Sequence, residues 1–246
     1  MLHLNRTIYG LKQAAVAFWK ELLQAFESMG FRRSPADPCL YVKNTTNGIV
    51  ILILWVDDCI LMGNKDEVSK YHKLMNSYFD CDNIGVLKEY VGCKIEKDEK
   101  KKCLLISQPV IVRSFIDEFG INENHKITVP ASKGDSLFPT MDGDDLTEEE
   151  QKGYRSGVGK LLYLSRWSRP DILNITRELS RYFMSANRAH FKAMKRVMIF
   201  CVNTKDYGIF INPKGKWEGT LDDSIFLRFS VFLTLIMQKM LQPEEV

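Results

Sequence analysis

An α+β fold is predicted for this chain, because its helical and strand-like segments follow one another in an irregular order. The first half reads as helix, hairpin, helix, hairpin and helix, which differs from the regular alternation of a parallel βαβ series. A stretch rich in acidic residues and glycine follows, and helical periodicity dominates the segments after it. We therefore expect an antiparallel sheet with helices, followed by a separate helical region.

The first helix is predicted from Leu11 to Met29, where apolar residues recur at steps of three and four before Gly30. A hairpin of strands Cys39–Lys43 and Ile49–Val56 comes next. The second of these strands is an unbroken run of apolar, mostly branched residues, which predicts burial on both faces of the sheet.

Two adjacent carboxylates, Asp57 and Asp58, stand between that strand and the next apolar stretch, Cys59–Met62. Carboxylates resist burial unless they bind a cation or a strong donor, so this tight turn is a candidate site for a metal ion. Aspartate is also a common turn residue, and a solvated hairpin tip is the alternative.

The next helix is predicted to begin at Asn64, which with Glu67 resembles a capping box, and to run to Phe79. A second hairpin is expected from strands Glu89–Lys97 and Cys103–Ser107, followed by a short helix, Val110–Phe119.

Residues 122–150 are predicted to form an acidic, solvated linker. Three helices are expected around and after its end, at about Thr147–Arg166, Pro170–Met184 and Arg188–Asn203.

Composition bounds the class of protein. With 246 residues, 45% of them hydrophobic, the chain suits one large or two modest globular domains. The six cysteines show no CxxC pair and the four histidines no ligand spacing, which favours reduced thiols in an intracellular protein, in cytoplasm or nucleus, and no zinc site. The apolar run Ile225–Met237 contains Arg228 and is too short to span a membrane, and no signal peptide is recognised.

Net charge is only +3, but positive charge is concentrated between residues 155 and 205. This segment contains eleven basic residues and only two acidic ones, Asp171 and Glu178. Such an excess favours contact with a nucleic-acid backbone, for which the candidates are Arg177, Arg181, Arg188, Lys192 and Arg196. The alternative is a solvated helix face over an apolar core.

Eight short segments, taken in order, resemble the copia-type retrotransposon reverse transcriptases. Residues 8–14 and 55–58 are similar to the family's "LYGLKQ" and "YVDD" boxes, and residues 79–85 and 89–96 to its "FEMKDLG" and "YFLGIEI" segments. Residues 106–108, 154–164, 169–172 and 205–208 resemble its "ISQ", "YRSLVGSLLYL", "TRPDI" and "TKDYG" stretches, so the resemblance covers about Leu4 to Ile211.

The resemblance implies a partial polymerase palm, an antiparallel sheet with helices on one face, followed by a helical thumb- or connection-like region. It implies RNA or DNA template-primer and deoxynucleoside triphosphates as ligands and Mg²⁺ as cofactor. It divides the chain into a partial palm (1–121), the linker (122–150), a basic thumb- or connection-like region (151–212) and a divergent tail (213–246).

The resemblance also assigns roles to individual residues of this chain. Asp57 resembles the metal-binding aspartate and Asp58 its less direct partner, while Trp55 replaces the tyrosine beside the primer end. Gln13 resembles the residue on the template side of the nucleotide site. The primer grip corresponds to Tyr90, Val91 and Gly92.

The family's other metal-binding aspartate lies upstream of the "LYGLKQ" box, on a strand without a counterpart in this chain. We therefore expect the chain alone to be catalytically incomplete, with upstream sequence or a protein partner supplying the acid and covering an unpaired edge of the palm sheet. The alternative is a non-catalytic nucleic-acid-binding or scaffold remnant of a retroelement.

Overall fold

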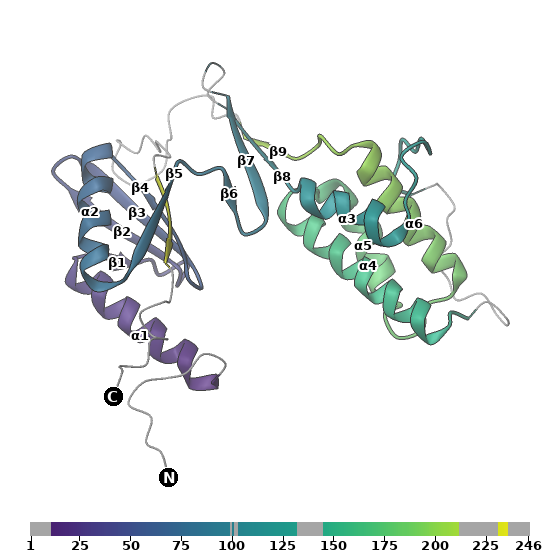
Figure 1. Ribbon diagram of the computed structural model, residues 1–246, viewed down its shortest axis with the longest axis horizontal. Coiled ribbons are helices and arrows are strands. Elements are labelled where there is room, and N and C mark those ends of the chain that lie inside the picture. The colour runs from purple at the N-terminus through teal and green to yellow at the C-terminus, as the bar shows by residue number, and fades with distance from the viewer. Residues whose placement is uncertain (1–10, 99, 101–102, 132–144, 212–230, 236–246) are drawn as a thin grey trace, which may run out of the picture. The chain divides into compact units, whose positions relative to one another are not determined.

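The computed structural model describes residues 11–98, 100, 103–131, 145–211 and 231–235. The chain divides into two compact units, one formed by the residues up to Leu87 together with those from Gly215 onward, the other by Lys88–Lys214. Mixed helix and antiparallel sheet are found as predicted (Figure 1). The sequence-based division into palm, linker, thumb- or connection-like region and tail is a division by function rather than by compactness. It stays a prediction.

The first unit contains a six-stranded antiparallel sheet in the order β1-β2-β3-β4-β10-β5. Its strands are β1 (Arg32–Arg33), β2 (Leu40–Thr45), β3 (Gly48–Trp55), β4 (Asp58–Met62), β5 (Cys81–Gly85) and β10 (Val231–Leu235). Strands β2, β3 and β4 confirm the predicted hairpins, whereas β1, β5 and β10 were not predicted.

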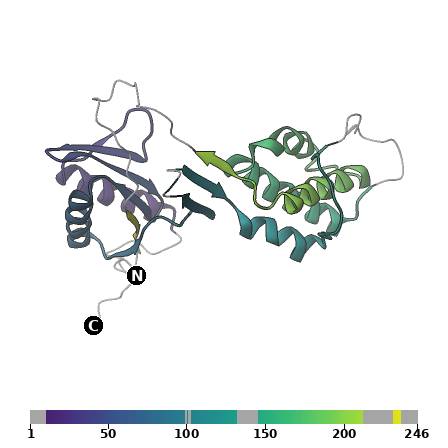
Figure 2. The same ribbon diagram turned by 90° about the horizontal axis from the view of Figure 1, so that it is seen from above.

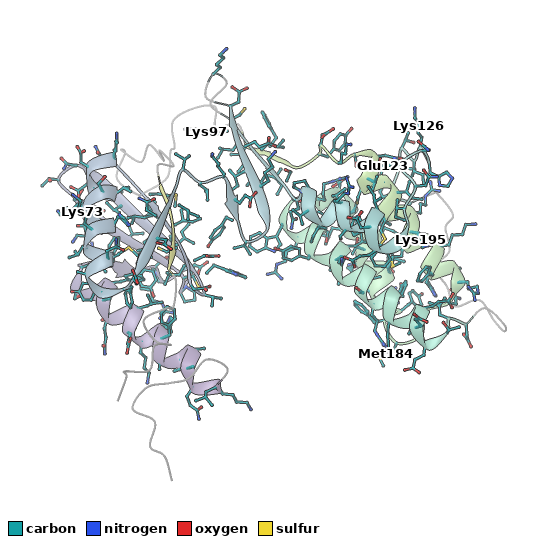
Figure 3. All side chains as sticks on the ribbon, in the orientation of Figure 1. Lys73, Lys97, Glu123, Lys126, Met184 and Lys195 are labelled. Atoms are coloured by element: carbon teal, nitrogen blue, oxygen red, sulfur yellow. The ribbon has the colours of Figure 1, made fainter. Side chains whose placement is uncertain are left out.

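Among the described residues of this unit, two segments are helical, α1 (Lys12–Ser28) and α2 (Lys65–Tyr78). Their apolar residues share one core with the alternate β3 residues Val50, Leu52 and Leu54, while the β3 isoleucines between them are only half-buried. Lys73 lies on the opposite, polar side of α2 (Figure 3). The prediction that β3 is buried on both faces is therefore wrong, because described helices cover only one face of the sheet.

The start of α2 differs from the predicted capping box. The Asn64 side chain accepts a hydrogen bond from the Asp66 backbone N–H, two residues into the helix. The Glu67 carboxylate instead accepts from the side-chain amide of Asn47, in the β2–β3 turn. Glu67 therefore ties helix to hairpin, and the box is wrong although the helix boundary is right.

The second unit begins with a smaller antiparallel sheet in the order β6-β7-β8-β9. Its strands are β6 (Glu89–Tyr90), β7 (Cys93–Asp98), β8 (Cys103–Ser107) and β9 (Ile209–Ile211). The hairpin of β7 and β8 confirms the prediction, but residues 89–97 do not form one strand. The chain reverses at Val91 and Gly92, so that β6 pairs back on β7.

The other described elements of this unit are helices, as Figure 2 shows from above. Helix α3 (Pro109–Phe119) ends at Gly120 in the left-handed conformation. Helix α4 (Glu148–Trp167) is followed by a 3-10 turn, η1 (Pro170–Ile172), then α5 (Leu173–Ser180) and α6 (Arg188–Asn203). Three predicted helices are confirmed, although the middle one ends at Ser180 rather than Met184.

The described end of the predicted linker belongs to a helix. Thr147 and Glu150 form a capping box, and Glu148 and Glu149 lie in the first turn of α4, where carboxylates interact favourably with the helix dipole. Residues 132–144 and most of the predicted tail lie outside the described residues. All six cysteines are free, and no described helix is both long enough and apolar enough to cross a membrane.

Candidate functional site

The β3–β4 hairpin turn carries the two adjacent carboxylates. Trp55 and Asp58 are paired across the strands, so the connection consists of only Val56 and Asp57. Val56 has φ +57 while Asp57 does not have a positive φ, the φ pattern of a type II′ turn, which normally has glycine first. A branched residue is strained there, and such strain persists only where the surroundings enforce it.

Asp57 and Asp58 are each half-buried where the largely apolar strands β3 and β4 meet. Cys59, the next residue, is fully buried, and burial first, then Cys81 and Asp58, raises the pKa of its thiol. The carboxylates therefore mark the border between an apolar sheet and solvent. Oxygen ligands at such a border suit a hard divalent cation that keeps some of its water.

A metal ion at this turn would need further ligands. Mg²⁺ is commonly held by one or two protein carboxylates together with substrate phosphates, so this aspartate pair fits part of such a site. Within the described ranges, no group of three or more histidine, cysteine or acidic side chains is placed to hold a metal. The turn thus supplies two ligands rather than a closed cage.

Exposed apolar surface surrounds the pair of carboxylates. Trp55, at the end of the largely apolar β3, is 46% exposed, and Val56, in the turn after it, is 71% exposed. An exposed indole beside two acids offers a face on which a nucleobase can stack. Gln13 lies on the exposed side of α1, in the same unit as this turn.

The β6–β7 turn contains the three residues predicted to form the primer grip. Tyr90 pairs with Cys93, leaving Val91 and Gly92 as a two-residue turn with φ +47 and +70, the φ pattern of a type I′ turn. Tyr90 and Val91 are half-buried and Gly92 is exposed. The three residues lie in the second unit, whereas Gln13, Trp55, Asp57 and Asp58 lie in the first.

Five basic residues of α5, α6 and their connection were predicted to bind phosphate. Arg177 and Arg181 both contact the Glu178 carboxylate, at 3.2 and 2.9 Å, and Arg188 contacts Glu150 at 3.0 Å. These contacts lower the pKa of Glu178, and backbone hydrogen bonding from Thr147, with a smaller effect of Arg188, lowers that of Glu150. Lys192 is exposed, and Arg196 is half-buried.

The basic segment also contains a residue that serves the core. Arg169 is 2% exposed, donates to Asp171 and to both oxygens of Thr204, and lies against the rings of Phe200 and Tyr207. From the sequence, Arg169 was predicted only as one of the eleven basic residues and as part of the motif at residues 169–172. Its position in that motif, directly before Pro170, was the only sequence signal that Arg169 differs from the exposed basic residues around it.

Comparison with known proteins identifies the family. A family model described as "Reverse transcriptase (RNA-dependent DNA polymerase)" matches residues 1–133, more than half of the chain. The retrovirus-related Pol polyprotein from transposon TNT 1-94 of Nicotiana tabacum is 27% identical over 82% of this chain. That from transposon RE2 of Arabidopsis thaliana is 29% identical over 90% of it.

This chain spans 16% of each of these plant polyproteins. It covers 63% of a putative transposon Ty5-1 protein of Saccharomyces cerevisiae, which is 24% identical over 80% of the chain. No solved structure gives a significant match. By its family match and its relatives, the chain belongs to the reverse transcriptases of copia-type retrotransposons.

Proposed function

We propose that the chain forms the part of an RNA-directed DNA polymerase that carries the second metal-binding acid and the elements gripping the primer. The observation that carries this proposal is the β3–β4 turn, where two carboxylates and an exposed indole meet at the end of a buried hairpin. The reaction is attack of the primer 3′-hydroxyl on the α-phosphorus of a deoxynucleoside triphosphate paired with an RNA or DNA template, which extends the primer by one nucleotide and releases pyrophosphate.

In this proposal Asp57 is the principal metal ligand and Asp58 assists it. Mg²⁺ bound there would neutralise the triphosphate of the incoming nucleotide. Trp55 provides a stacking surface at the primer end, and Gln13 contacts the template side of the nucleotide. Tyr90, Val91 and Gly92 hold the primer strand through the backbone of their turn.

We also propose that this chain alone does not complete a two-ion site. Two-ion phosphoryl transfer needs ligands for two cations about 4 Å apart, and two neighbouring carboxylates on one turn supply too few. The missing acid would come from another segment or from a protein partner. A partner at a sheet edge stays a prediction: among described strands, β10 pairs with β4, and β1 and β5 are the outer strands.

The test compares wild type, Asp57→Asn and, as a matched control, Asp80→Asn, which removes an exposed acid of the same unit. With primer-template, deoxynucleotides and Mg²⁺, we expect no primer extension above the Asp57→Asn level from any of them. Mn²⁺ titration followed by electron paramagnetic resonance should show a weak site that Asp57→Asn loses and Asp80→Asn keeps.

Two outcomes would contradict these proposals separately. Extension by wild type that disappears in Asp57→Asn would show a complete active site and refute the incompleteness. Mn²⁺ binding that is equal in all three proteins would refute the metal role of Asp57.

A non-catalytic nucleic-acid-binding function is the second candidate. The observation that favours it is the group of basic side chains on α5, α6 and their connection, which does not involve the carboxylate turn. The ion pairs with Glu178 and Glu150 count against this function, because they partly neutralise the arginines. Exposed pairs of this kind contribute little stability, however, so a phosphate can compete for the arginines.

A further inference from the structure

Two motifs that lie far apart in the sequence meet inside the second unit. The Tyr163 hydroxyl on α4 donates a hydrogen bond to the backbone carbonyl of Val91, with an oxygen–oxygen distance of 2.5 Å. Val91 belongs to the segment matched to the primer grip, whereas Tyr163 belongs to a helical motif to which the proposed function gives no role. Both residues lie between Lys88 and Lys214.

The turn that Tyr163 contacts has a backbone unsuited to its sequence. A type I′ turn needs positive φ at both central residues and strongly prefers Asn-Gly. Gly92 tolerates its φ of +70, but Val91 is β-branched and is strained at +47. A Cβ at position 92 would also lie 3.0 Å from the Tyr163 hydroxyl, a tight contact that the hydroxyl could relieve only by moving a few tenths of an ångström.

The hydroxyl is held on a rigid support. Leu161 and Leu164, on either side of Tyr163, are fully buried in the helical core. The Trp167 ring lies one turn further along α4, with its centroid 6.3 Å from that of Tyr163. A tyrosine hydroxyl is protonated at neutral pH and can donate, and burial, then Cys93, raises the pKa of Tyr163 further.

We infer that Tyr163 is a positioning residue that fixes the Val91–Gly92 turn to helix α4 for contact with the primer strand. The hydrogen bond compensates the strained φ of Val91 and leaves Gly92, which is exposed, at the tip. Strained backbone retained by an outside contact is typical of sites that need one fixed conformation. The inference rests on the proposed primer-gripping role of this turn.

The variant Tyr163→Phe removes the hydroxyl and keeps the ring. Tyr154→Phe is its matched control, because the Tyr154 hydroxyl on the same helix also donates to a carbonyl, that of Leu179, at 2.7 Å. A third protein, Val91→Asn with Tyr163→Phe, gives the turn a residue that adopts positive φ readily.

The measured quantity is the ratio of affinities for a primer-template with a recessed 3′ end and for a blunt duplex of equal length, by fluorescence anisotropy at fixed low salt. Tyr163→Phe should lower this ratio about 3- to 10-fold, the effect of one lost hydrogen bond. Tyr154→Phe should lower the melting temperature but keep the ratio, and the double variant should recover it.

Hydrogen exchange of the free protein tests the clamp without nucleic acid. Exchange at the Gly92 and Cys93 amides should accelerate in Tyr163→Phe and not in Tyr154→Phe. The inference would be overturned if exchange or the affinity ratio were unchanged in Tyr163→Phe, or if Tyr154→Phe lowered the ratio equally. A wild type without preference for the recessed end would overturn it too. A wild type that binds neither duplex would overturn the proposed function itself.

Discussion

Arg169 shows that an arginine expected at the surface from its charge can be buried and join two elements of the core. Its guanidinium makes a bidentate contact with Asp171 and reaches Thr204, which ends helix α6. Two aromatic rings, those of Phe200 and Tyr207, cover it. The planar fork joins the η1 turn to the end of α6, a role that lysine cannot take over.

We expect Arg169→Lys to lower the free energy of unfolding by about 2 kcal/mol, because it keeps the charge but loses the forked hydrogen bonds to Asp171 and Thr204. Urea denaturation followed by circular dichroism measures this. Arg166→Lys, an exposed change in the same segment, should stay within about 0.5 kcal/mol of wild type. Equal stability of the two variants would refute the structural role of Arg169.

Single residues were predicted as far as neighbours in the sequence determine them. The tight turn was predicted because an apolar strand flanks each side, but its position is shifted by one residue: Val56 and Asp57 form the connection, and Asp58 begins β4. The burial of Arg169 depends on Phe200 and Thr204, which no local pattern connects to it. The roles assigned to Gln13, Trp55 and the primer-grip residues remain predictions, since they concern ligands.

Helix α4 contains glycines in two opposite environments. A Cβ on Gly157 would lie 2.5 Å from the Met194 sulfur and 2.8 Å from the Met198 methyl group, both fully buried on α6. A Cβ on Gly159 would meet no atom within 4 Å, and that residue is exposed. Close approach of α4 and α6 therefore depends on the first glycine and not on the second.

We expect Gly157→Ala to destabilise the protein by about 1 kcal/mol, because overpacking against α6 outweighs the gain in helix propensity. Gly159→Ala should stabilise it by roughly 0.5–1 kcal/mol through helix propensity alone. Thermal denaturation of the two variants side by side measures the difference. Stabilisation by both substitutions would show that the methionines yield without cost.

Elements with a long apolar period were predicted well, as α1, α3, α4 and α6 show. Short strands were not: β1, β5 and β9 are at most five residues long, and β5 and β9 pair with strands that are distant in the sequence. The break between β6 and β7 was missed because valine is a poor residue for a turn with positive φ.

Charge is the property of the whole molecule that bears on binding. The net value of +3 hides the basic excess of the second unit. Since phosphate neutralisation supplies most affinity that is independent of sequence, binding to duplexes should weaken steeply with salt. The carboxylate turn should contribute little to it.

If about four to six phosphates are neutralised, the slope of log K against log salt should be about −4 to −5. Replacing Arg181, Arg188, Lys192 and Arg196 by Ala should flatten the slope and reduce affinity together. A control with the same charge change in the first unit, at Lys20, Lys65, Lys70 and Lys73, should keep most of the slope. Equal slopes in both quadruple variants would assign the charges of α5 and α6 to a solvated helix face.

The position of β10 has a consequence for synthesis. Its residues pair with Leu61 on one side and Cys81 on the other, so the sheet of the first unit takes a strand from near the C-terminal end. The whole of Lys88–Lys214 therefore leaves the ribosome before that sheet can close. The second unit can fold while one edge of β4 and the backbone of β5 still lack β10, so we expect the first unit to be the slower and more chaperone-dependent part.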